Sequence, residues 1–227
     1  MRNTDIGVRR RRRPRRLGVV VASGLLSASG CAELVTERAF APVATPEAGP
    51  DATIEFTAPA AVYVLHVRLS GGASFVRWRS GGREVGVHAR PHSTTYWSWG
   101  PVLPVIPVFG TSRARELEVD AWASGGDNPI RARLPDFVLR VPGRSDSVAP
   151  AAARVPATAT ATLRGAMGDE AVVTGRAVSV RLIYPLDPDE VETADLSVRF
   201  AAEDASWEFA RTVRFVRAQT TFVMTIP

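Results

Sequence analysis

The chain has 227 residues and a formal net charge of +5, a length that suits one or two domains with a hydrophobic core. All 28 basic residues are Arg, and eight of them lie in the first 16 residues beside a single acid, Asp5. The remainder carries 20 Arg against 22 acidic residues. The pI near 10.5 therefore describes the N-terminus and does not indicate a nucleic-acid-binding protein.

The N-terminal segment has the three parts of a secretory signal peptide. A basic region at 9–16 precedes an apolar region at 17–26, and the small residues that follow end in Cys31, the only Cys of the chain. The 14 residues from Leu17 to Gly30 are too few to span a bilayer and are interrupted by Gly. We therefore predict that residues 1–30 are a signal peptide.

The sequence Ala28-Ser29-Gly30-Cys31 resembles the lipobox of bacterial lipoprotein precursors, which ends in a small residue followed by an invariant Cys. The resemblance covers residues 1–31, with Ala28 where the family usually has Leu. It implies that Cys31 is diacylated, freed by signal peptidase II and N-acylated, with fatty acids such as palmitate. The acyl chains would then insert into a membrane, which is the expected partner of the protein. Ala32, in place of Asp, favours the periplasmic side of the outer membrane over the inner membrane. The alternative is an ordinary signal peptide that leaves a free thiol.

Residues 31–50 are predicted to be the lipidated Cys and a flexible tether. Pro42, Pro46, Pro50 and several Ala residues show no apolar periodicity.

Residues 51–143 alternate between apolar and polar side chains, as half-buried β-strands do. The segments 61–69, 73–79 and 83–90 are separated by Ser-Gly-Gly at 70–72 and 80–82, which indicates a β-meander. Two further strands are predicted at 115–123 and 136–141.

Residues 94–110 separate the meander from these strands. Pro101, Pro104 and Pro107 recur every third residue, which is the period of polyproline II. We predict that this segment is a long connection covering the apolar edge of the sandwich, with Val105, Ile106 and Phe109 buried.

Residues 144–156 are rich in Ser, Ala and Pro and form the one plausible internal boundary. Residues 156–227 are predicted as a second β region, either separate or part of the same sandwich. Its strands are expected at 158–163, 171–174, 177–184, 195–201, 207–217 and 220–226, with one helical turn at 187–190. The chain is thus predicted to be all-β, an antiparallel β-sandwich of Ig-like or similar form, after a signal peptide and tether.

A basic patch is predicted on one face of the meander. Its members share the outward parity of three consecutive strands: His66, Arg68, Arg77, Arg79, His88 and Arg90. It either binds an anionic group or is neutralised by neighbouring acids, with Glu116, Glu118 and Asp120 as the obvious partners.

Three aromatic residues, Tyr96, Trp97 and Trp99, are the candidate recognition residues. Trp97 and Trp99 would share one face of a strand, roughly 7 Å apart, a spacing that suits stacking on sugar rings. The alternative is that they anchor the core.

No metal site or cofactor is predicted. His88 and His92 have the spacing of a helical zinc pair, but Pro91 and the strand pattern exclude the helix. The acidic residues at 187–195 lack the spacing of a calcium loop and are predicted to be a solvated loop.

No catalytic motif is present, so the chain is not expected to be an enzyme. The sequence favours a lipid-anchored envelope protein with a β-sandwich that binds or scaffolds an envelope protein or glycan. Alternatives are a carbohydrate-binding module that uses Trp97 and Trp99, and an enzyme whose site the sequence does not reveal. The oligomeric state is left open.

Overall fold

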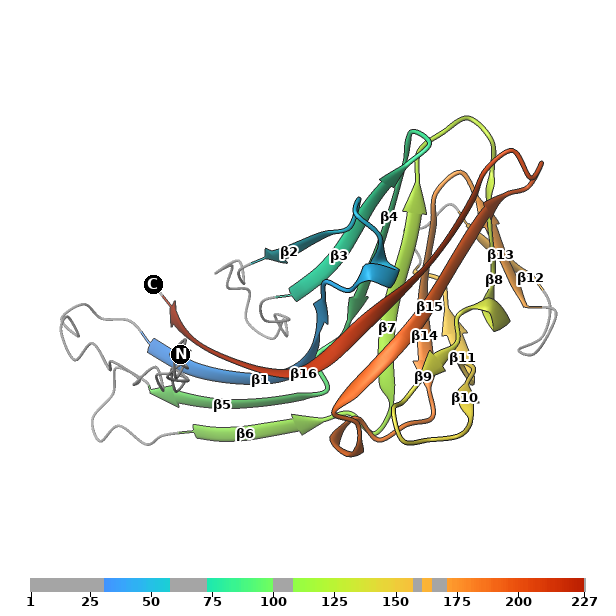
Figure 1. Ribbon diagram of the computed structural model, residues 1–227. Helices are drawn as coiled ribbons and strands as arrows, with labels where there is room; N and C mark the ends of the chain where they lie inside the picture. Colours follow the sequence, from blue (N-terminus) through green and yellow to red (C-terminus); the bar gives the residue numbers. More distant parts are fainter. Residues whose placement is uncertain (1–30, 58–72, 100–107, 157–160, 165–170, 227) are drawn as a thin grey trace, which may run out of the picture.

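Two antiparallel β-sheets form the molecule, as the computed structural model shows (Figure 1). The structure describes residues 31–57, 73–99, 108–156, 161–164 and 171–226. The first sheet has the order β12 (Thr162–Arg164), β13 (Val172–Gly175), β8 (Ile130–Arg133), β15 (Thr193–Ala202), β16 (Glu208–Ile226), β1 (Cys31–Val43), β5 (Ser93–Trp99) and β6 (Val108–Arg113), with β9 (Leu139–Arg140) and β10 (Ser147–Val148) beside β15. The second has the order β11 (Ala152–Arg154), β14 (Val178–Tyr184), β7 (Leu117–Ser124), β4 (Arg83–Ala89), β3 (Ala73–Ser80) and β2 (Thr53–Thr57). This arrangement confirms the predicted all-β sandwich.

Strict alternation builds the core. On β7, Leu117, Val119, Ala121 and Ala123 are buried, and the residues between them are not. Because successive side chains of a strand point to opposite faces, this pattern supplies one wall of a two-layer core. The largest fully buried side chains include Trp78, whose indole N–H donates to the Ala48 carbonyl at 2.8 Å.

Both sheets combine strands from the two halves of the chain. β14 pairs with β7 in the second sheet, and β15 and β16 join β1 and β8 in the first. One cluster of buried residues extends from Phe40 to Phe215. Residues 144–156 contain β10 and β11, which pair in different sheets, so this segment crosses between the layers of one sandwich.

Four strands extend beyond the sandwich as a curved arm, at the left of Figure 1. We define the arm as residues 31–38 of β1, 219–226 of β16, and all of β5 and β6. β1 lies between β16 and β5, and β6 follows β5 at the edge.

The predicted tether is wrong for residues 31–43, which form the strand β1, and Pro46–Ala48 form the single-turn helix η1. The burial of β1 changes parity along its length, since Val35 and Glu37 are buried and then Phe40. A twisted strand that leaves the arm and enters the sandwich therefore lacks a simple period-two pattern.

Residues 94–110 also differ from the prediction of one connection, because β5 and β6 occupy their two ends and pair with each other. The predicted burial of Val105, Ile106 and Phe109 lies outside what the structure describes, as does the predicted strand at 61–69. The strand predicted at 136–141 is reduced to β9, since Leu134–Asp136 form the single-turn helix η2 around Pro135. The strands predicted at 207–217 and 220–226 are one continuous strand, β16.

The helical turn predicted at 187–190 is confirmed as η3 (Pro188–Glu190). Asp187 caps it by accepting a hydrogen bond from the Asp189 backbone N–H at 2.9 Å. Across the described residues, no helix is long and apolar enough to cross a membrane.

Candidate functional site

The arm changes in composition along its axis. Near its free end, Leu34 lies opposite Val223 and Trp97, and Val35 lies opposite Phe222 and Tyr96. The next register row is Thr221, Thr36, Thr95 and Thr111, in which the Thr36 and Thr221 hydroxyls are 3.1 Å apart. Closer to the sandwich, one row contains Gln219, Arg38, Ser93 and Arg113. The arm therefore grades from apolar at its tip to hydroxyl-rich and then basic at its root.

Tyr96 and Trp97 are surface residues of the arm. Their exposed fractions are 38% and 42%, so neither anchors the sandwich core. The Tyr96 ring covers Gly110 on β6 so closely that a Cβ added there would lie 2.1 Å from the ring. Gly110 is thus the position that lets the tyrosine lie flat across the neighbouring strand. The side chain of Trp99 lies outside what the structure describes.

Cys31, the predicted lipidation residue, is the first residue of β1. It is in register with Ile226, and the next pair in the arm is Ala32 with Trp99. The predicted acylation point therefore lies at the tip of a folded element.

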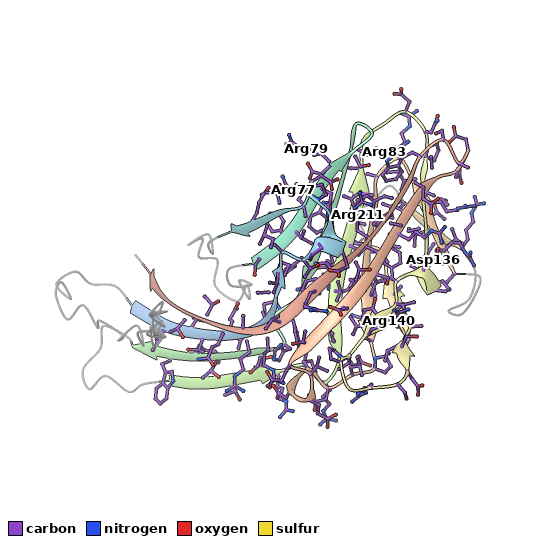
Figure 2. The ribbon with its side chains drawn as sticks, viewed as in Figure 1. Arg77, Arg79, Arg83, Asp136, Arg140 and Arg211 are labelled. Atoms are coloured by element: carbon purple, nitrogen blue, oxygen red, sulfur yellow. The ribbon has the colours of Figure 1, made fainter. Side chains whose placement is uncertain are left out.

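Two arginines of the predicted basic patch, Arg77 and Arg90, form ion pairs on the outer face of the second sheet. Figure 2 labels Arg77 and Arg79 along β3. Arg77 lies 3.2 Å from Glu84 and 3.7 Å from Glu55. No described residue forms an ion pair with Arg79. His66 and Arg68 lie outside the described residues.

A four-residue charge network completes this face. Arg90 and Arg181 both contact Asp120, at 3.1 and 2.8 Å, and both lie within 3.7 Å of Glu118. Glu118 and Asp120, two of the three acids expected as partners, therefore lie against Arg90, and anion binding by the patch stays a prediction. Sequence patterns do not place Arg181 on this face because β14 joins the sheet from a distant part of the chain.

His88 lies opposite Asp120 in the β4–β7 register. Burial lowers its pKa below the ordinary value, and the Asp120 carboxylate only partly opposes this shift. His88 is therefore neutral at pH 7 and adds no charge to the face.

A cavity of about 320 Å³ lies where the arm meets the sandwich. It is polar and is lined by Glu37, Arg90, Pro91, His92, Thr94, Ser112, Arg113, Ala114, Glu116 and Glu118. Glu37 and His92 are almost completely buried, with exposed fractions of 4% and 3%.

His92 is fixed mainly by its backbone and by one ring contact. Its N–H donates to the Arg38 carbonyl at 2.9 Å, and its ring lies 5.4 Å from the Phe40 ring. Nε2 is 3.6 Å from Asp189 Oδ1, too long for a hydrogen bond. Burial lowers the pKa of His92, with Asp189 opposing, so the ring is neutral at pH 7.

Arginine side chains hold three of the acidic residues at 187–195, Asp187, Asp189 and Asp195. Arg113 bridges Asp187 and Asp189 at 3.0 and 2.8 Å. Arg214 holds Asp195 with two hydrogen bonds, of 2.7 and 2.8 Å. Among the described residues, no group of three or more His, Cys, Asp or Glu side chains is placed to hold a metal ion.

The junction cavity brings Glu116 and Glu118 together with His92, while His88 lies outside its lining. Both of its arginines are already held by carboxylates, Arg90 by Asp120 and Glu118, and Arg113 by Asp187 and Asp189. The cavity therefore presents a neutral imidazole, hydroxyls, two carboxylate-bound arginines and the acidic residues Glu37 and Glu116, an arrangement suited to hydrogen bonding with a polar group. Its walls come from three separate segments, at 37, 90–94 and 112–118, so no short-range sequence pattern points to it.

No protein-family model, curated protein or solved structure matches the chain significantly.

Proposed function

We propose that this protein is a lipid-anchored protein of a bacterial cell envelope whose β-sandwich binds or scaffolds another envelope component. The observation that supports this most is the position of Cys31. The residue that resembles a lipoprotein acylation site is also the first residue of β1, at the free end of the arm. An acyl anchor there would be joined directly to folded structure.

Such an anchor is strong enough to be permanent. Each buried methylene contributes about 0.8 kcal/mol, so two or three acyl chains hold a protein where one chain binds only reversibly. Because β1 is paired on both sides, the anchor would also restrict how the sandwich is oriented above the bilayer. A flexible tether would not impose that restriction.

The anchor is tested by Cys31→Ala in cells fed an alkyne-tagged palmitate. The unchanged chain should incorporate the label, fractionate with membranes and accumulate as a precursor when signal peptidase II is inhibited. The variant should lose the label and the processing. Ser27→Ala, outside the four lipobox residues, is the matched control and should behave as the unchanged chain. Identical labelling and fractionation of Cys31→Ala would refute the proposal.

Glycan binding by the arm is the second candidate function. It is supported by the 42% exposure of Trp97 and by the position of Trp99 two residues further along the same strand. Retention of the protein on an envelope polysaccharide should fall on Trp97→Ala. Trp122→Ala, on the outer face of the second sheet, is the control for the general effect of removing a tryptophan side chain. Retention that is absent, or equal in both variants, removes this candidate.

A further inference from the structure

We infer that the arm itself, and not the lipid alone, contacts the bilayer, lying along the membrane interface with Trp97 and Arg38 on the face toward the lipid. This inference rests on the proposed function, because it takes Cys31 as the point of attachment. It adds a protein–lipid contact to the acyl anchor and sets the orientation of the arm relative to the membrane.

The first support is the distribution of charge along the arm. The five register rows at the tip contain a single acidic or basic residue, Glu33, among Cys31–Val35, Tyr96–Trp99, Val108–Gly110 and Phe222–Ile226. The two rows behind them carry seven hydroxyl residues and one acid: the first row is Thr221, Thr36, Thr95 and Thr111, and the second is Thr220, Glu37, Thr94 and Ser112. Arg38 and Arg113 come next, in one row.

One face of the arm has the residue types of a membrane interface. Trp97 and Arg38 lie on this face with Leu34 and Thr36, whereas Tyr96 lies on the opposite face, where Val35 and Glu37 are buried. Trp is enriched at the boundary between hydrocarbon and water, and Arg meets the phosphate groups of lipids. Arg38 is exposed, and no described carboxylate forms an ion pair with it.

Distances along the strands decide between an upright and a reclining arm. The rise of about 3.3 Å per residue puts the Trp97 row roughly 10 Å, and the Arg38 row roughly 23 Å, from Cys31. The polar layer on each side of a bilayer is only about 5–8 Å thick. An arm standing upright on Cys31 would hold Trp97 beyond this layer, whereas a reclining arm places Trp97 and Arg38, which share a face, against lipid.

Backbone chemistry limits how deep the arm can go. Among the described strands, β6 has a neighbour on one side only, and residues 217–226 of β16 pair only with β1. Open sheet edges carry unpaired N–H and C=O groups, which hydrocarbon does not tolerate. The arm is therefore an interfacial element and not a spanning one.

The test uses the lone cysteine. In the lipidated protein the Cys31 sulfur is blocked as a thioether, so Trp97→Cys supplies the one free thiol for a nitroxide label. Tyr96→Cys supplies it on the opposite face of the arm. The full processed protein is reconstituted in vesicles of phosphatidylethanolamine and phosphatidylglycerol. Collision of the label with oxygen, which partitions into lipid, is compared with collision with a water-soluble nickel chelate. Ser206→Cys, at the exposed β15–β16 turn, is the matched control.

The label at 97 should favour oxygen over nickel at least several-fold more than the labels at 96 and 206. It should lose this preference when the protein is transferred from vesicles into an amphipathic polymer without lipid. Nickel access equal to that at 206 overturns the inference while leaving the anchor intact. Shielding from both reagents also overturns it, because another protein segment or a glycan then covers the arm. If a thiol titration finds Cys31 free in the unchanged protein, the proposed function fails and the inference falls with it.

Discussion

Trp78→Phe provides a direct test of whether residues 46–48 belong to the fold. The Trp78 side chain is fully buried, its ring packs edge-on against Phe209 at 5.2 Å, and its N–H is the donor to the Ala48 carbonyl. The phenylalanine keeps the ring contact but removes this donor, which leaves a buried carbonyl unpaired at a cost of about 1–3 kcal/mol. The smaller ring vacates roughly 40 Å³, which at about 24 cal/mol per Å³ adds about 1 kcal/mol.

The expected loss in the free energy of unfolding is therefore about 2–4 kcal/mol, or a fall in Tm of roughly 5–12 °C for a chain of this size. Urea unfolding followed by circular dichroism measures it. Trp122→Phe is the matched control, since the Trp122 ring lies over Gly86 on the outer face of the same sheet. The control should lose less than about 1 kcal/mol. Equal losses in the two variants would show that Ala48 is not fixed to the core and would refute the reasoning.

Three further predictions follow from the charges and the strand pairing. Trypsin should cut after Arg144, in an exposed loop, long before it cuts after Arg38, whose strand is paired on both sides. Mass spectrometry of the fragments measures the order of cleavage, and early cleavage after Arg38 would favour a flexible tether over a strand. Burial lowers the pKa of His92, so the unfolded chain binds a proton on this imidazole more readily than the folded chain does. The folded state therefore keeps its full stability above about pH 6.5 and loses stability as the pH falls below that value. The Tm should drop between about pH 7.5 and about pH 5.5, and an equal drop in His92→Gln would contradict this assignment. Asp120→Asn should cost about 1–2 kcal/mol in urea unfolding because it weakens two partly buried ion pairs, whereas Glu208→Gln, from an exposed pair, should cost less than about 0.5 kcal/mol; equal costs would count against the network.

Local alternation was sufficient to predict most of the sandwich. Leu117–Ser124 alternates strictly between buried and half-buried residues because one of its faces lies on the core. Arg83–Ala89 departs from this pattern only at Gly86, which the Trp122 ring covers. The Ser-Gly-Gly turn at 80–82 places Gly81 and Gly82 at φ of 57° and 73°, a conformation that glycine adopts without strain. These features depend only on neighbouring residues, so they can be predicted from the sequence.

The arm was missed because its pairing is non-local. Cys31 pairs with Ile226 and Leu34 with Val223, contacts that no short-range pattern encodes. Proline at 42 and 46 also suggested a linker, although Pro42 is part of β1 and Pro46 begins η1. Tyr96 and Trp97 are candidate recognition residues from their type alone, with the core as the alternative, and only the register places them beside the strand that begins at Cys31.

The most direct test of the account is the chemical state of Cys31 in protein purified from membranes. Mass spectrometry of the N-terminal peptide should show a mature chain that begins at Cys31 and carries a diacylglyceryl thioether, with or without a third acyl group on its amine. A peptide that contains Cys31 with a free thiol, or a mature N-terminus at another residue, would contradict the lipid anchor and the membrane-facing role of the arm.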